Sequence, residues 1–200
     1  EKQSALNVDC FPTVSELPAK ECQQLIERKI DVILENGFEK DFVPSGAEFE
    51  KRRAEAPAAR LRVARALTGD KIADDAIIIG IGGRMEMRNK GIDLFLETMI
   101  RLKHCAQLSR DVVAFIDVPA WSDVARGDLQ KRLASGETEW STPLRDPYLT
   151  HNLCNFEHDA IAQTIRNIGL ANYDGKSRVK VIYVPCYLKG SDGIFNKDYY

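Results

Sequence analysis

The chain has 200 residues with 28 basic and 30 acidic side chains, so it is long enough for one domain or slightly more. This balanced charge excludes a strong electrostatic attraction for nucleic acid or a membrane surface. Five scattered cysteines, none in a C-x-x-C pair, favour reduced thiols. No signal-peptide pattern or membrane-length apolar run is present, and we therefore expect a cytoplasmic protein.

Residues 1–40 have the pattern of a strand, a helix and a second strand. Short apolar runs at 8–15 and 31–34 favour the two strands. Pro18 suits the first turn of the helix between them. Asn36-Gly37 is a turn signal that ends the second strand.

Residues 47–68 are rich in Ala, Arg and Glu, which favours helix, and Pro57 predicts two helices or one that kinks. The arginines of this segment raise the alternative of a nucleic-acid patch. Glutamates dilute them and no aromatic residues interleave, so we favour a solvated helix face. These arginines are Arg52, Arg53, Arg60, Arg62 and Arg65.

The central motif of the chain lies at 77–102. Three isoleucines lead into a glycine-rich turn, and apolar residues at helical spacing begin at Ile92. This pattern predicts a buried strand, a turn and an amphipathic helix, the unit that places a phosphate at the carboxyl end of a parallel strand. Glycines at the turn let a ligand approach the backbone closely.

Two familiar phosphate motifs do not fit this turn. A dinucleotide fingerprint starting at Gly80 would need glycine where Met85 stands, and a nucleoside-triphosphate loop would need Ser or Thr where Gly91 stands. Arg84 and Lys90 flank the same loop, from which both could reach one diphosphate. The alternative is an ordinary turn of an α/β core with incidental charges.

The rest of the chain continues the alternation of strands and helices. Nearly continuous apolar runs at 111–118 and 178–184 are typical of parallel strands covered on both faces. A helix is expected at 158–170, and a short one around 129–133 within the more polar stretch 120–147. The chain is therefore predicted to be an α/β protein with a Rossmann-like, doubly wound parallel sheet.

Residues 151–158 contain two imidazoles and a thiol. The spacing of His151, Cys154 and His158 fits no common structural zinc pattern, and a fourth ligand would have to come from afar. No metal site is predicted here. A Ser–His–Asp nucleophile is not indicated either, because no glycine-flanked serine elbow is present.

The loop G-G-R-M-E-M-R-N-K-G-I-D-L-F-L-E resembles that of the glycogen synthase family, A-G-R-Y-E-F-S-N-K-G-x-D-x-F-L-E. Met85 and Met87 depart from the tyrosine and phenylalanine of the family, which puts aromatic packing under the loop in question. T-H-N and T-I-R-x-I-G-L in 150–170 also resemble the family. The matching loop residues are Arg84, Glu86, Asn89, Lys90, Gly91, Asp93, Phe95, Leu96 and Glu97.

A second match follows the third strand. P-C-Y-L resembles the family's H-P-E-F-L, with Tyr187 at the phenylalanine and Val184 in place of the histidine. Tyr199 matches the tyrosine of a family D-Y pair. In the family these two aromatic residues face the uracil base, so the resemblance makes Tyr187 and Tyr199 base-stacking candidates. Each could instead be a rim aromatic that meets no ligand.

The resemblance implies a retaining glycosyltransferase of the two-Rossmann-domain GT-B class. Residues 1–40 would be the trailing strand–helix–strand of an N-terminal domain, and 41–200 a truncated C-terminal nucleotide-sugar-binding domain. The full enzyme would transfer glucose from UDP-glucose to the non-reducing end of an α-1,4-glucan (glycogen), without a metal or other cofactor. The 200-residue fragment itself is expected to be inactive.

The resemblance also assigns roles to the loop. Arg84 and Lys90 would be catalytic, stabilising the negative charge of the leaving diphosphate. Gly82 and Gly83 would bind the nucleotide together with the two tyrosines.

Two readings stay open beside this one: a synthase that uses ADP-glucose, and a non-catalytic module that binds nucleotide sugar or glucan. A nicotinamide oxidoreductase is disfavoured because the third fingerprint glycine is missing. The expected partners are UDP-glucose and glycogen, with no nucleic acid and no membrane. A homo-oligomer is also left open, because the apolar residues of 8–34 should either pack on a second copy or stay exposed.

Overall fold

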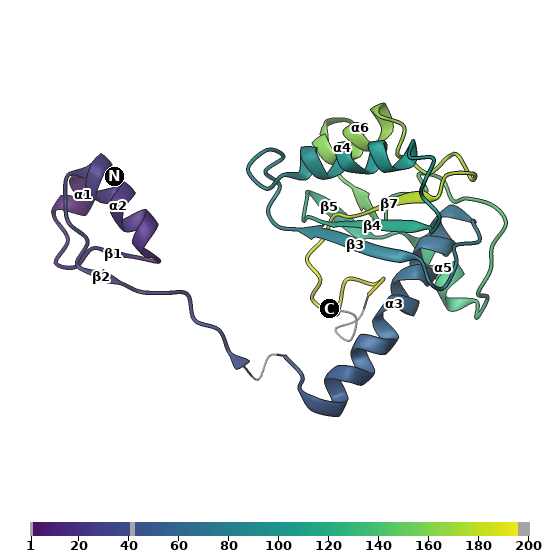
Figure 1. Cartoon of the computed structure of the whole chain (residues 1–200), viewed down its shortest axis with the longest axis horizontal. Helices are drawn as coiled ribbons and strands as arrows, with labels where there is room; N and C mark the ends of the chain where they lie inside the picture. The colour runs from purple at the N-terminus through teal and green to yellow at the C-terminus, as the bar shows by residue number, and fades with distance from the viewer. Residues whose placement is uncertain (1, 41–42, 196–200) are drawn as a thin grey trace. The chain divides into compact units, whose positions relative to one another are not determined.

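The structure, a computed structural model, describes residues 2–40 and 43–195. It contains two compact units, Glu1–Ser45 and Gly46–Tyr200 (Figure 1). The assignment of 1–40 to the end of an N-terminal domain stays a prediction. Within the described ranges no helix is long and apolar enough to cross a membrane. All five cysteines are free thiols.

The first unit contains the predicted strand–helix–strand. Strands β1 (Pro12–Thr13) and β2 (Val32–Ile33) pair in parallel and flank helix α2 (Glu16–Ile26). A short helix α1 (Lys2–Leu6), which the sequence pattern did not indicate, precedes them. The strands are only two residues long, and none of the residues of α2 is buried.

The second unit is built on a parallel sheet in the order β3-β4-β7. β4 (Val112–Asp117) and β7 (Val179–Val184) are buried as their apolar runs predicted. The prediction of a buried strand was wrong for β3 (Ile77–Gly82), where Ile77 is 39% exposed. In the described part of the chain β3 pairs with β4 alone, so it forms an edge that the neighbouring layers cover only partly.

Helices cover both faces of this sheet, which confirms the doubly wound fold (Figure 1). On one face, α4 (Ile92–Lys103) and α6 (Ala160–Asn167) bury an apolar stripe that includes Leu96 and Ile161. On the other face, α3 (Gly46–Thr68) and α5 (Gly127–Ala134) bury Leu67 and Leu129. Each layer removes one face of the sheet from water, which is the main stabilising contribution.

Helix α3 runs through Pro57 as one element, so two separate helices do not form. The prediction of a solvated arginine face was wrong for its carboxyl-terminal half. Arg62 donates to the carbonyl of Leu133 at 2.8 Å, and Arg65 pairs with Asp74 at 2.7 Å. Long arginine stems can lie along a buried helix face while the guanidinium reaches polar partners at the rim.

Two short strands that the sequence pattern did not predict complete the unit. β5 (Ser122–Ala125) pairs antiparallel with β6 (His151–Leu153). Just before β6 the chain runs beside β7, because the Tyr183 amide donates to the Tyr148 carbonyl and the Thr150 amide to the Tyr183 carbonyl. This pairing brings His151 to the carboxyl end of β7. A single 3₁₀ turn (Phe156–His158) then leads into α6.

Gly69 directly follows helix α3, and there the backbone passes very close to another segment. Gly69 has a φ of 68°, and a Cβ placed on it would lie 2.3 Å from the Thr142 carbonyl carbon. Thr142 belongs to the described segment 135–147, which contains neither helix nor strand. Only glycine can therefore form this contact.

Candidate functional site

The predicted loop and the segment after β7 meet at the carboxyl ends of the parallel strands. There they enclose a cavity of about 390 Å³ whose lining includes Gly83, Arg84, Asp117, Cys186 and Tyr187. Three of the residues singled out from the sequence, Gly83, Arg84 and Tyr187, thus share one cavity. Crevices at this edge are where open α/β sheets bind ligands.

Gly82 and Lys90 lie next to this cavity but are not among its lining, as far as the described residues define it. Gly82 is the last residue of β3 and pairs in register with Asp117. Gly83 has a φ of 154°, and a Cβ on it would lie 3.7 Å from the Cγ and Cδ of Lys90. The stem of Lys90 therefore passes over Gly83, the residue before Arg84.

Glu86 links the two sides of the loop. Its Oε1 lies 3.0 Å from Nε of Arg84, and its Oε2 accepts a hydrogen bond from Asn89 at 3.3 Å. The Arg84 side chain is 77% exposed, so this ion pair is the contact that orients it. The carboxylate draws Nε of the guanidinium toward itself, and among the contacts of the described residues the other N–H groups stay available to a ligand in the cavity.

The first amides of α4 are already hydrogen-bonded within the loop. The amides of Ile92 and Asp93 donate to the Met87 carbonyl at 2.8 and 3.3 Å, and the Leu94 amide donates to the Asp93 carboxylate. An open helix N-terminus is a good phosphate site only when such amides are unpaired. The positive charge available to an anion here therefore comes from Arg84 and Lys90 rather than from the helix end.

The two methionines that replace the family's aromatic residues are packed. Met85 and Met87 are partly buried against the cluster under α4. Methionine fills irregular apolar gaps well, so the loop keeps an apolar base without a ring.

A charge pair that the sequence analysis missed involves Asp117, which lines the cavity. Arg60 from α3 donates to the carboxylate of Asp117 at 3.1 Å, and its guanidinium stacks 4.6 Å from the ring centroid of Phe115 and 5.0 Å from that of Phe195. Arg60 offsets a negative charge that would otherwise repel an anionic ligand. In the sequence, Asp117 could have been recognised as a polar residue at the end of a buried apolar strand.

Tyr187 is 66% exposed, and the Lys189 ammonium lies 5.3 Å from its ring centroid. The ring is therefore accessible at the rim of the cavity, as a stacking platform requires, with a cation over it. The second stacking candidate, Tyr199, lies outside the described residues, so its role stays a prediction.

The histidine and cysteine cluster considered from the sequence takes a different form. His151 is buried, whereas Cys154 and His158 are exposed. The metal-ligand side chains that the described part of the chain brings together are His151, Cys186 and Asp192. Cys186 and Asp192 follow β7, more than thirty residues from His151, so no local spacing could reveal the group.

The parallel sheet, its two helical layers and the basic glycine turn at its carboxyl edge define a Rossmann-like domain of the glycosyltransferase kind. A family model described as glycogen synthase matches residues 1–134, and the chain belongs to this family.

Curated relatives align with the whole chain. Glycogen (starch) synthase isoform 1 of Saccharomyces cerevisiae is 27% identical, with 37% of its own length covered. The Dictyostelium discoideum glycogen (starch) synthase is 29% identical with 28% covered, and the liver enzyme of Mus musculus 27% identical with 35% covered. The chain thus spans roughly a third of the length of the relatives that it matches.

Proposed function

We propose that the chain carries the donor side of a glycogen synthase, which transfers glucose from UDP-glucose to the non-reducing end of an α-1,4-glucan with retention of configuration. One observation supports this most directly: Gly83, Arg84 and Tyr187 line one cavity at the carboxyl edge of the sheet. A diphosphate on the loop and a base on Tyr187 would both fit a cavity of about 390 Å³. UDP-glucose as donor, glycogen as acceptor and a cytoplasmic location belong to the same proposal.

The chemistry asks the protein to stabilise a departing nucleoside diphosphate. Negative charge grows on that group as the bond between the anomeric carbon of glucose and the diphosphate oxygen breaks and the glucosyl unit passes to a hydroxyl of the acceptor glucan. Arg84, which pairs with Glu86, would donate to the diphosphate oxygens through its planar guanidinium, and Lys90 would do so through its compact ammonium. Such charges act best when they are in place before the reaction. No metal ion is required in this scheme.

The roles of the two cations can be tested by substitution in the full-length polypeptide. Arg84→Ala and Lys90→Ala should each lower kcat/KM by roughly 10²–10³, equivalent to ~2.7–4 kcal/mol. Arg88→Ala is the matched control, because Arg88 is exposed on the same loop but, unlike Lys90, is not among the described side chains that lie against Gly83. Wild-type rates in the Arg84 and Lys90 variants would contradict the proposal.

The stacking role of Tyr187 predicts a selective loss of affinity. Tyr187→Ala should weaken UDP binding by about 1–3 kcal/mol, because one base would lose its aromatic platform. Binding of inorganic diphosphate should not change, since it has no base. Equal losses for UDP and diphosphate would show that the substitution disturbs the loop instead.

Two alternatives differ in measurable ways. An ADP-glucose-dependent synthase would bind ADP more tightly than UDP in direct competition. A non-catalytic module would bind nucleotide sugar while the full-length polypeptide transfers no glucose. Homo-oligomerisation is also part of the proposal, and its support is the exposed apolar surface of the first unit.

A further inference from the structure

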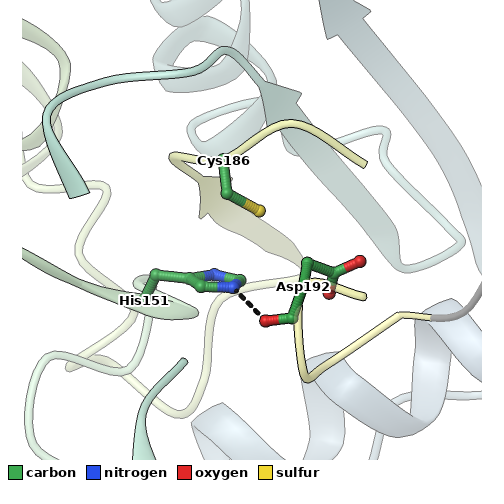
Figure 2. Close-up of side chains that lie close together, drawn as sticks. All are labelled: His151, Cys186 and Asp192. Carbon is green, nitrogen blue, oxygen red and sulfur yellow. Dashed lines mark hydrogen bonds between the residues drawn. The ribbon is translucent and has the colours of Figure 1, made fainter. Parts of the chain in front are cut away.

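Three side chains with metal-ligand atoms converge beside the donor cavity, which is the cavity lined by Gly83, Arg84 and Tyr187. Figure 2 shows the thiol of Cys186 directed toward the space between the His151 imidazole and Asp192. Their ligand atoms all lie within 4.8 Å of one another. His151 is 2% exposed, and the other two are partly buried. The group is therefore a semi-enclosed set of one nitrogen, one sulfur and one carboxylate.

The fold, rather than chance on a flexible surface, brings these residues together. His151 begins β6, which pairs with β5, and the Thr150 amide anchors the preceding residue to β7. Cys186 follows β7 by two residues, so both groups sit at the same edge of the sheet. Asp192 is held in a turn in which its Oδ1 accepts from the amides of Ile194 and Phe195, at 2.9 and 2.7 Å.

One atom of this group is left without a partner. Oδ2 of Asp192 is buried and finds no hydrogen-bond donor within the described ranges. A buried, unpaired carboxylate oxygen is costly and calls for a bound cation or water. Because Oδ1 is already used by two amides, Oδ2 is the oxygen available to an ion.

The histidine can supply a lone pair by a simple change of tautomer. Its Nε2 faces the carbonyl oxygen of Asp192 at 2.9 Å, and its Nδ1 lies 2.9 Å from the hydroxyl of Thr150. The Thr150 hydroxyl can donate either to Nδ1 or to the Tyr183 carbonyl, 3.2 Å away. In the second arrangement Nδ1–H donates to Thr150 and Nε2 carries the lone pair, so a metal can bind Nε2 once the Asp192 carbonyl, which then has no N–H to accept from, moves aside. A histidine whose other ring nitrogen donates to a neighbouring oxygen is the usual arrangement around a bound metal. Burial lowers the pKa of His151, which favours the neutral ring that a metal needs.

We propose that His151, Cys186 and Asp192 form a binding site for a divalent transition-metal ion of the zinc type. The mixture of imidazole, thiolate and carboxylate suits Zn²⁺ and disfavours Mg²⁺ and Ca²⁺, which prefer oxygen ligands. Three protein ligands leave the fourth tetrahedral position for water or another ligand.

Binding requires a small contraction and the loss of one proton. With metal–ligand distances of 2.0–2.3 Å, ligand atoms in a tetrahedral zinc site stand roughly 3.3–3.6 Å apart, so the widest separation must close by about an ångström. We expect this movement at Asp192, whose Oδ1 would keep its bonds to the Ile194 and Phe195 amides while Oδ2 turns toward the ion. Burial and the nearby Asp192 and Asp117 raise the pKa of the Cys186 thiol to about 12. The cation reverses that effect, and the thiol proton passes to solvent as the thiolate binds.

The ion would act on the donor cavity through one short segment. Cys186 and Tyr187 line both the donor cavity and a neighbouring cavity of about 570 Å³ that also contains His151 and Asp192. A metal bond to Cys186 would tie this segment to β6 and so fix the backbone that carries Tyr187. This regulatory consequence rests on the proposed function, whereas the metal site itself does not.

The test is a titration of the 200-residue chain with Zn²⁺ against a chromogenic chelator, without nucleotide. The wild type should bind one equivalent, and Mg²⁺ in excess should not compete. Cys186→Ala, His151→Gln and Asp192→Asn should each weaken binding by more than about 100-fold, because loss of residues that merely orient ligands already costs 10–100-fold. Thr150→Val removes only the partner of Nδ1, so it should weaken zinc binding by about 10–100-fold.

A matched control and a spectroscopic readout make the outcome decisive. Cys154→Ser removes an exposed thiol three residues from His151 and should leave affinity unchanged. Co²⁺ should give a thiolate charge-transfer band that is lost in Cys186→Ala and kept in Cys154→Ser. Unchanged zinc affinity in Cys186→Ala, or no stoichiometric binding by the folded wild type, overturns the proposal. Either result would leave the UDP and kinetic tests of the donor site unaffected.

Discussion

The two units of the chain use the same local pattern with very different results. Each has parallel strands joined through a helix, yet β1 and β2 are two residues long whereas β3, β4 and β7 have six each. In the first unit, only Ala5 is buried among the residues that the structure describes. The second unit has a helical layer on each face of its sheet. An amphipathic pattern is thus enough to form a helix or a strand, but a core forms only where a second layer covers the apolar face of that element.

Exposed apolar side chains mark the difference most clearly. Leu17, Leu25 and Leu34 of the first unit are 67%, 76% and 58% exposed. Scattered exposed leucines are ordinary on proteins, but a concentration of them on a small unit favours a further partner.

The free energies of opening measured by hydrogen exchange should differ between the two units by several kcal/mol. Amides of 8–34 should exchange with protection near zero, whereas those of β4 should approach the global unfolding free energy, about 5–15 kcal/mol for a protein domain. The measurement is a dilution series followed by mass spectrometry. Protection of 8–34 that falls on dilution would show packing against a second copy. Strong protection that does not depend on concentration would contradict the low protection expected for these residues.

A matched pair of leucine substitutions should reproduce the contrast in stability. Leu96, on α4, is 1% exposed, and Leu96→Ala should lower the free energy of unfolding by about 2–5 kcal/mol through lost burial and a residual cavity. Leu25→Ala should change it by no more than about 0.5 kcal/mol. Urea unfolding of both variants gives the comparison, and equal effects would mean that Leu25 is buried in solution.

Helix capping offers a smaller contrast. Asp159 caps α6 by accepting from the Ala162 amide at 2.8 Å, whereas Ser15, before α2, makes no side-chain capping bond in the described chain. Asp159→Ala should therefore cost about 0.5–2 kcal/mol, and Ser15→Ala very little. Thermal unfolding of each variant measures this, and a comparable loss for Ser15→Ala would show that α2 is capped in solution.

The same aspartate should give a weak pH dependence. Burial raises the pKa of Asp159 above its unfolded value, so the folded chain binds more protons than the unfolded chain between the two pKa values. Stability should fall as pH rises through that window and should level off above the folded pKa. Asp159→Asn keeps an acceptor for the Ala162 amide but has no proton to lose. The difference in stability between wild type and variant across the acid range isolates this effect, and a constant difference would contradict it.

The sheet could be predicted from sequence where the apolar runs are continuous. Residues 111–118 and 178–184 gave β4 and β7 because central strands are apolar on both faces. The run of isoleucines before Gly80 looks equally buried, yet β3 lies at an edge. Position within a sheet depends on which strands pair, and this information is not local. β5 and β6 were missed because their residues are polar and their pairing depends on the path of 148–150 beside β7.

Some residues of the candidate site could likewise be predicted from local sequence, whereas others could not. Arg84, Lys90 and Gly83 belong to one short loop and could be recognised together. Asp117 with Arg60, and Cys186 with His151, join segments far apart in the chain. Such pairs arise only when the fold packs a helix or another strand beside the carboxyl end of a parallel strand, so they could not be predicted from local sequence.

The contact between Gly69 and Thr142 limits how this protein can vary. Every missense change in a glycine codon adds a side chain, and at position 69 its first atom would overlap the backbone of Thr142. No substitution at position 142 can relieve the overlap, because the atoms concerned are common to all residues. In a saturation mutagenesis library, position 69 should accept glycine alone, whereas exposed positions such as Glu137 should accept many residues. Side chains of 135–147 can thus change during evolution, while the path of this segment's backbone past the end of α3 stays the same.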